Sequence, residues 1–97
     1  MAKATRVLDR KIKRGELMAQ LVVWRLPVAD RNRPHAIKYR LWCGQAGETI
    51  VRYDNETGKG DHRHYGDREE CYGFASPEQL VQDFAEDVER LTGWRIE

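Results

Sequence analysis

A short polar segment, residues 53–65, holds most of the side chains in this chain that could do chemistry. His62 and His64 are two residues apart, so in an extended segment both imidazoles project from one face, with Arg63 and Tyr65 on the other. Histidine exchanges protons near neutral pH, and two imidazoles can cleave RNA without a metal. One would take the proton from a ribose 2′-hydroxyl, and the other would protonate the leaving oxygen.

Charged neighbours of the histidines extend this chemistry. Lys59 or Arg63 would stabilise the charge that builds on the phosphate during cleavage. Asp54 and Asp61 support a second reading, in which they and the histidines hold a divalent metal that activates water against a phosphodiester. His35 would be a further ligand. We therefore expect no cofactor in the first reading and a divalent metal in the second.

In a third interpretation, the segment supports the fold and takes no part in catalysis. Glycine, asparagine and aspartate are common turn formers, so residues 53–72 would form a loop with a charged tip. Asp61 would cap backbone N–H groups, and Tyr65 would anchor the fold. In that case the protein would be a binding module for nucleic acid or protein, without catalysis.

The elements that must position this segment are mainly strands. Residues 17–26 are rich in Val, Leu and Trp, and residues 36–43 alternate between apolar and polar side chains. A short turn at 44–47 leads to a further strand at 48–54, so these two strands form an antiparallel hairpin. Residues 1–15 alternate poorly, and an edge strand and a frayed helix remain alternatives for them.

The outward side of these strands is predicted to be basic. With Thr49, Val51 and Tyr53 turned inward, Arg52 faces outward. A basic stripe for RNA is then expected from Lys38, Arg40 and Arg52, and Arg25 could extend it, with Trp24 and Trp42 available for stacking on bases. Arg63 is a further expected RNA-binding residue. The alternative is that these are ordinary charged strand positions and that the tryptophans pack under the helix.

One amphipathic helix is predicted at residues 76–92. Ser76 is a suitable N-cap, Pro77 fits the first helical position, and Gln79 completes a capping box. Leu80, Phe84, Val88 and Leu91 form a single apolar stripe, which should cover one face of the sheet. We therefore predict an α+β fold: an antiparallel meander of about four strands with this helix on one face.

Composition indicates one soluble domain. The chain has 97 residues, no apolar run long enough to cross a bilayer, and no apolar stretch typical of a signal peptide, so a cytoplasmic location is expected. Cys43 lies in an apolar strand pattern and is expected to be a buried free thiol. Residues 1–52 contain 12 Lys or Arg against 4 Asp or Glu, whereas residues 53–97 contain 5 against 12. The two halves could neutralise each other, or the basic half could bind RNA.

Several short motifs together resemble the TumE family of toxins. They occur in the order Trp24-Arg25-Leu26-Pro27, Lys38-Tyr39-Arg40-Leu41, Tyr53-Asp54-Asn55-Glu56, Gly58-Lys59-Gly60-Asp61-His62-Arg63-His64, Glu69-Glu70 followed by Tyr72 and Phe74, and Gln79-Leu80 with Asp83-Phe84, across residues 17–91. Cys71 departs from the pattern, because proline is expected after the paired glutamates.

The resemblance implies a small toxin of a toxin–antitoxin pair, held by a neighbouring antitoxin that is often a winged-helix DNA-binding protein. Together with the residue chemistry, it predicts a toxin that acts on RNA, as an endoribonuclease or as an inhibitor of translation. An open sheet edge leaves a homodimer as an alternative to the monomer.

Overall fold

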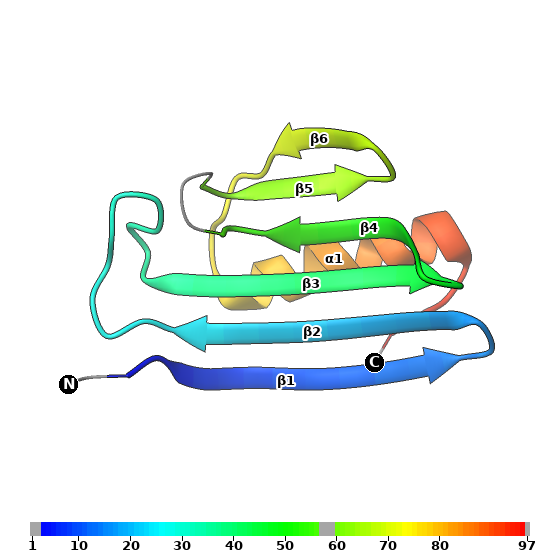
Figure 1. Cartoon of the computed structure of the whole chain (residues 1–97), viewed down its shortest axis with the longest axis horizontal. Coiled ribbons are helices and arrows are strands. Elements are labelled where there is room, and N and C mark those ends of the chain that lie inside the picture. Colours follow the sequence, from blue (N-terminus) through cyan, green and yellow to red (C-terminus); the bar gives the residue numbers. More distant parts are fainter. Residues whose placement is uncertain (1–2, 57–59, 97) are drawn as a thin grey trace.

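The computed structural model describes residues 3–56 and 60–96. Within them, a six-stranded antiparallel sheet runs in the order β1-β2-β3-β4-β5-β6, followed by one helix, α1 (Figure 1). The elements are β1 (Thr5–Arg14), β2 (Leu17–Arg25), β3 (Ile37–Gln45), β4 (Glu48–Asp54), β5 (His62–Tyr65), β6 (Arg68–Cys71) and α1 (Pro77–Thr92). The predicted fold class is confirmed, with six strands where about four were expected.

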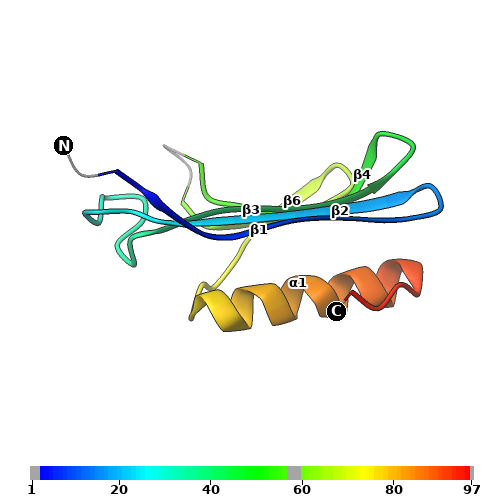
Figure 2. The same cartoon turned by 90° about the horizontal axis from the view of Figure 1, so that it is seen from below.

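The helix lies along one face of the sheet and leaves the other uncovered (Figure 2). Because side chains alternate along a strand, residues next to those buried under α1 must project from the uncovered side. We call this side the open face; it carries Trp24, Lys38, Arg40, Trp42, Arg52, Asp54, His62 and His64. The opposite side is the helix side.

One segment confirms an alternative that the sequence left open, and a second differs from the sequence-based expectation. Residues 5–14 form a full strand, which decides between the two alternatives left open for the N-terminal segment. The expected loop at 53–72 contains the β5–β6 hairpin. Its turn is only two residues long, and Gly66 has a φ of 60°, which suits the first position of a tight hairpin turn. The abundance of charged residues in β5 and β6 hides this hairpin from a reading of hydrophobic periodicity.

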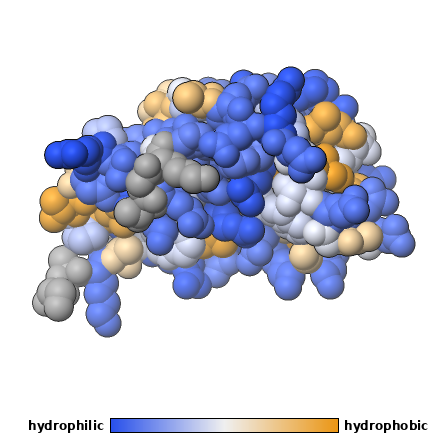
Figure 3. All heavy atoms as spheres, turned by 45° about the horizontal axis from the view of Figure 1, so that its top comes forward, coloured by the Kyte–Doolittle hydropathy of each residue, from blue (hydrophilic) through white to orange (hydrophobic). Residues whose placement is uncertain are grey.

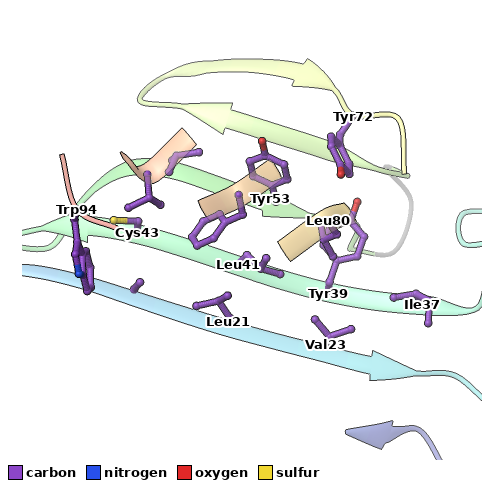
Figure 4. Packing of buried hydrophobic residues seen from close by; sticks show 14 residues of the cluster. Leu21, Val23, Ile37, Tyr39, Leu41, Cys43, Tyr53, Tyr72, Leu80 and Trp94 are labelled. Atoms are coloured by element: carbon purple, nitrogen blue, oxygen red, sulfur yellow. The ribbon is translucent and has the colours of Figure 1, made fainter. Parts of the chain in front are cut away.

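The helix begins and ends as predicted. The Ser76 hydroxyl accepts a hydrogen bond from the Gln79 backbone N–H at 3.0 Å, and Gly93 closes the C-terminus in a left-handed conformation. Leu80, Phe84 and Val88 of the predicted stripe are fully buried against the sheet, where Figure 4 labels Leu80. The expectation that Leu91 belongs to the buried stripe is wrong, because Leu91 lies in the last turn of the helix and is 41% exposed. The sheet contributes Leu21, Val23, Ile37, Tyr39, Leu41, Cys43, Val51 and Tyr53 to this core. Cys43 is therefore a buried free thiol, as expected.

A buried asparagine joins the end of β4 to β3. The side chain of Asn55 accepts a hydrogen bond from the Tyr39 backbone N–H at 3.0 Å and donates one to the Ile37 carbonyl at 2.7 Å. The amide thus continues the ladder where the backbone of β4 turns away. Asn55 is fully buried, so these two groups of β3 have no access to water at this point.

A carboxylate on α1 joins the helix to the strands above it. Asp87 accepts hydrogen bonds from the hydroxyls of Tyr53, at 2.5 Å, and Tyr65, at 2.6 Å, and pairs with Arg90 at 2.9 Å. Burial opposes ionisation of Asp87, but these three donors outweigh it and hold its pKa below the usual range. The cluster fixes β4 and β5 over the helix from the side opposite the histidines.

Replacing Asn55 should weaken the fold. Asn55→Ala leaves a buried N–H and a buried carbonyl of β3 unpaired, so the free energy of unfolding should fall by about 2–4 kcal/mol in urea denaturation. Asn32→Ala, a substitution of the only other asparagine and one in a half-buried loop position, is the matched control. Equal stability of the two variants would contradict the bridging role of Asn55.

The Asp87 cluster should make stability depend on pH. A carboxyl whose pKa is lowered in the folded state contributes stability above its ordinary pKa near 4 and loses it as the pH falls through the folded value. Asp87→Asn should therefore be less stable than the unaltered protein by about 1–3 kcal/mol at pH 7, and the difference should shrink below about pH 4. Urea denaturation across this pH range measures it. A difference that stays constant into acid would show that the carboxylate charge plays no part.

Candidate functional site

The two histidines lie side by side on the open face. The register pairs His62 with Asp54 and His64 with Arg52 across β4 and β5. Tyr53, between the two β4 residues, is fully buried under α1. The prediction that both imidazoles share one face, with Arg63 and Tyr65 on the other, is confirmed.

A glutamate from β6 contacts both imidazoles. Glu69 lies opposite His64 in the β5–β6 register, and its carboxylate is 3.6 Å from His64 Nδ1 and 3.3 Å from His62 Nε2. Both histidine side chains are largely buried, with 16% of His62 and 12% of His64 exposed. The carboxylate therefore restrains the two rings from the same side.

The two histidines differ in the partners of their ring nitrogens. His62 places Nδ1 2.9 Å from the Gly60 carbonyl and Nε2 3.3 Å from Glu69, and both of these partners are hydrogen-bond acceptors. His64 faces Glu69 with Nδ1, but its Nε2 lies 3.2 Å from Arg52 Nη2, which can only donate. Arg52 can donate to His64 Nε2 only where that nitrogen carries a lone pair, as in the tautomer with its proton on Nδ1.

Arg52 connects this histidine to an aspartate. Its Nε lies 3.0 Å from Asp54 Oδ2, and Asp54 Oδ1 is 3.8 Å from His64 Nε2. The Nε of Arg52 is buried but makes no well-aligned hydrogen bond in the described residues. The pair of Arg52 and Asp54 is therefore held by charge rather than by a directed hydrogen bond.

Asp61 does not join the histidine pair. Its carboxylate accepts hydrogen bonds from the Tyr39 hydroxyl at 2.7 Å and Asn55 Nδ2 at 3.3 Å, and lies 3.2 Å from His35 Nε2. The Ile37 backbone N–H donates to His35 Nδ1, which assigns the ring proton to Nε2 and so to Asp61. Burial, then the hydrogen bond to Asp61, raises the pKa of Tyr39, so its hydroxyl keeps its proton. Asp61 and His35 thus hold a structural corner.

The predicted RNA-binding residues divide between the two sides. Lys38, Arg40 and Arg52 lie on the open face, and Lys38 Nζ is 5.3 Å from the ring centre of Trp24. Arg25 lies on the helix side, beside the start of α1. Arg63 also lies there, with its Nε 2.6 Å from Glu70. The stripe is therefore shorter than predicted, and Lys59 lies outside the described residues.

The Trp42 indole lies against Gly44 on the open face. A Cβ atom at Gly44 would approach the Trp42 ring to 2.3 Å, so only glycine leaves room for the indole there. Trp42 Nε1 donates to the Thr49 hydroxyl at 2.8 Å. The expectation that Thr49 faces inward is wrong, because an irregularity in the β3–β4 register turns it to the open face. The hydrogen bond from Trp42 to Thr49 therefore orients the indole.

The side of the molecule seen with the β6 edge forward in Figure 3 is mainly polar. With the β6 edge brought forward, this side of the molecule is largely hydrophilic, and apolar patches lie toward its margins (Figure 3). In residues 3–56 and 60–96, no group of three or more His, Cys, Asp or Glu side chains is arranged to hold a metal ion. The metal-dependent reading therefore has no preformed site in that part of the chain.

Glu69 is the site residue that sequence reasoning missed. It is recognisable only if Gly66-Asp67 is read as a two-residue hairpin turn, which places Glu69 opposite His64. Cys71, noted for its departure from the family pattern, pairs with His62 in the same register and is exposed. Because the β5–β6 hairpin was not predicted, the positions of Glu69 and Cys71 beside the histidines were not predicted either.

Comparison with known proteins identifies the family of this chain. A family model described as "Toxin TumE" matches residues 2–92. The chain belongs to the TumE family. No curated protein matches it, and no solved structure matches it. As a member of a toxin family, this TumE protein has a cognate antitoxin as its expected partner. No helix in its described residues is long and apolar enough to cross a bilayer.

Proposed function

We propose that this TumE-family toxin acts in the cytoplasm as an endoribonuclease and that its antitoxin holds it inactive. The observation that carries the proposal is the placement of His62 and His64 next to each other on the open face, with the guanidinium of Arg52 against His64. An acid, a base and a cation within one small area are what cleavage by 2′-hydroxyl attack requires.

The contacts of the ring nitrogens support a division of roles between the two histidines in this proposal. His64, with a lone pair on Nε2, is the base, and His62, with acceptors at both nitrogens, is the acid. Glu69 and Asp54 do not touch the substrate in this scheme. Glu69 is a positioning residue, since its carboxylate faces both rings.

The reaction balances without a further reactant. His64 Nε2 takes the proton of the 2′-hydroxyl, and the 2′-oxygen forms a bond to phosphorus. The bond from phosphorus to the 5′-oxygen breaks, and that oxygen receives the proton of His62. The products are a 2′,3′-cyclic phosphate and a 5′-hydroxyl. Arg52 would leave His64 for the phosphate, which frees the lone pair and stabilises the charge of the transition state.

The neighbouring strands supply the binding surface. Lys38 and Arg40 extend the positive charge of Arg52 along the open face, so a phosphate backbone can cross β2, β3 and β4 toward the histidines. Trp24 and the oriented Trp42 present aromatic surface for stacking with unpaired bases. Single-stranded RNA is the substrate class that this combination fits best.

A second candidate function is binding without cleavage, which would block translation. One observation favours it: both imidazoles are already paired with protein groups and largely buried. In that case, the histidines would be structural. The winged-helix nature of the antitoxin and a toxin homodimer stay predictions under either function.

Cleavage should depend on both histidines. Purified protein incubated with total cellular RNA and transfer RNA should give discrete products, and His62→Ala or His64→Ala should lower the rate by 10²–10⁴-fold. Arg25→Ala, on the helix side, is the control that should cleave normally. A model RNA with sulfur in place of the bridging 5′-oxygen needs no acid, so it should restore cleavage by His62→Ala and not by His64→Ala.

Three results would contradict cleavage by the two histidines or favour another function. Intact RNA in every lane, with binding retained, would favour the non-catalytic function. Loss of cleavage in EDTA, restored by one cation, would favour the metal-dependent reading. Equal growth arrest by the unaltered protein and the double histidine variant in cells would exclude catalysis by these residues.

The salt dependence of RNA binding should come from the lysine and arginine side chains on the open face. Each lysine or arginine that contacts a phosphate adds about one to the slope of log affinity against log salt concentration. Arg40→Ala should therefore lower this slope by about one, measured by fluorescence anisotropy with single-stranded RNA. Arg25→Ala should leave the slope unchanged, because its side chain lies on the other side of the sheet. Equal slopes for the two variants would place the RNA elsewhere.

A further inference from the structure

β1 is a long, basic edge of the sheet. In the described residues it pairs with β2 on one side and with no strand on the other. Its ten residues carry five Lys or Arg against one Asp. The opposite edge, β6, has four residues. A ten-residue edge with unpaired backbone groups is a template for another extended chain.

The register identifies the outward backbone groups. The turn between β1 and β2 has two residues, Gly15 and Glu16, so the flanking Arg14 and Leu17 form a hydrogen-bonded pair. Hydrogen-bonded pairs recur at every second residue of an antiparallel ladder, which includes Ile12 and Arg10. The backbone N–H groups of Lys13, Lys11 and Asp9 therefore point away from β2.

An apolar groove runs beside this edge. It lies on the helix side between β1 and the beginning of α1 and has a volume of about 420 Å³. Val7, Leu8, Val23, Arg25, Pro77, Glu78 and Val81 line it. Val7 is 43% exposed and falls where the β1–β2 register shifts. A chain added to β1 could place an apolar side chain in this groove.

We propose that the antitoxin docks here, by adding an extended segment to β1 as a further strand. The segment would be acidic, to match Lys11 and Lys13, and would carry an apolar residue for the groove. This proposal rests on family membership and not on ribonuclease activity.

The charge and the shape of the edge select this occupant over two others. A second copy of this chain would bring two strongly basic β1 strands together, and like charges on neighbouring strands repel. RNA would be attracted by the charge, but it has no peptide backbone with which to continue the ladder of β1. An acidic polypeptide satisfies the charge, the ladder and the groove together.

Hydrogen exchange of the complex tests the location. In the free toxin, the amides of Asp9, Lys11 and Lys13 should exchange quickly because they face solvent. With the antitoxin encoded beside the toxin, the same amides should slow by at least tenfold. Protection confined to the open face or to β6, or protection that arises without antitoxin through self-association, would overturn the proposal.

A proline at an outward position tests the ladder. Lys11→Pro removes an N–H that β2 does not use, so the sheet should persist while the added strand loses a hydrogen bond. The Kd for antitoxin should rise at least tenfold, and co-expressed antitoxin should no longer neutralise the toxin. Lys11→Ala keeps the N–H and is the matched control, with a smaller rise. Equal affinities of the two variants would overturn the proposal.

Charge reversal keeps the test decisive if the proline variant does not fold. The double substitution Lys11→Glu and Lys13→Glu retains every backbone donor and changes only exposed side chains. It should raise the Kd for antitoxin at least tenfold, with circular dichroism and thermal midpoint unchanged. Unchanged affinity in this variant would show that the basic edge is not the docking surface.

Discussion

The two-residue repeat of a strand, combined with a single covering helix, is the constraint on which the structure depends. Each residue that turns toward α1 commits its neighbours to the opposite side. Because Val51 and Tyr53 are buried, Arg52 and Asp54 must be on the open face. The histidines then reach them only because β5 pairs in register with β4. A slip of one residue would move the imidazoles to the helix side and bring Arg63 and Tyr65 out.

The separation of the two sides of the sheet also shows whether the acidic half of the chain neutralises the basic half. The acidic helix lies on one side of the sheet, whereas Lys38, Arg40 and Arg52 project from the other. These cations therefore cannot be neutralised by the acids of α1 across the thickness of the sheet. What neutralisation exists near the histidines is local and comes from Asp54 and Glu69, so the positive charge of β3 stays available to an anion.

Sequence reasoning succeeded where hydrophobic period and capping agree. The alternation at 36–43 and the Ser76 cap locate β3 and α1 closely. It failed where charged residues form strands: β5 and β6 have no apolar alternation, so their short turn was the only signal. Asp61 was assigned to the histidine site because it is next to His62 in the sequence. Its carboxylate instead contacts Tyr39 and His35, which are distant in sequence and could not be identified as its partners. Arg25 was assigned to the wrong side because the register of β2 was not known.

The meander order has a consequence for how the protein is made. Every strand pairs with its neighbour in the chain, so contacts are short in sequence and each hairpin can form as it leaves the ribosome. β1 and β2 are synthesised first, and the β5–β6 hairpin and α1 come last. At ordinary elongation rates of about 5–20 residues per second, the N-terminal edge exists for a few seconds before the histidines are in place. An inhibitor that binds this edge would therefore meet the nascent chain before the chain has an assembled site.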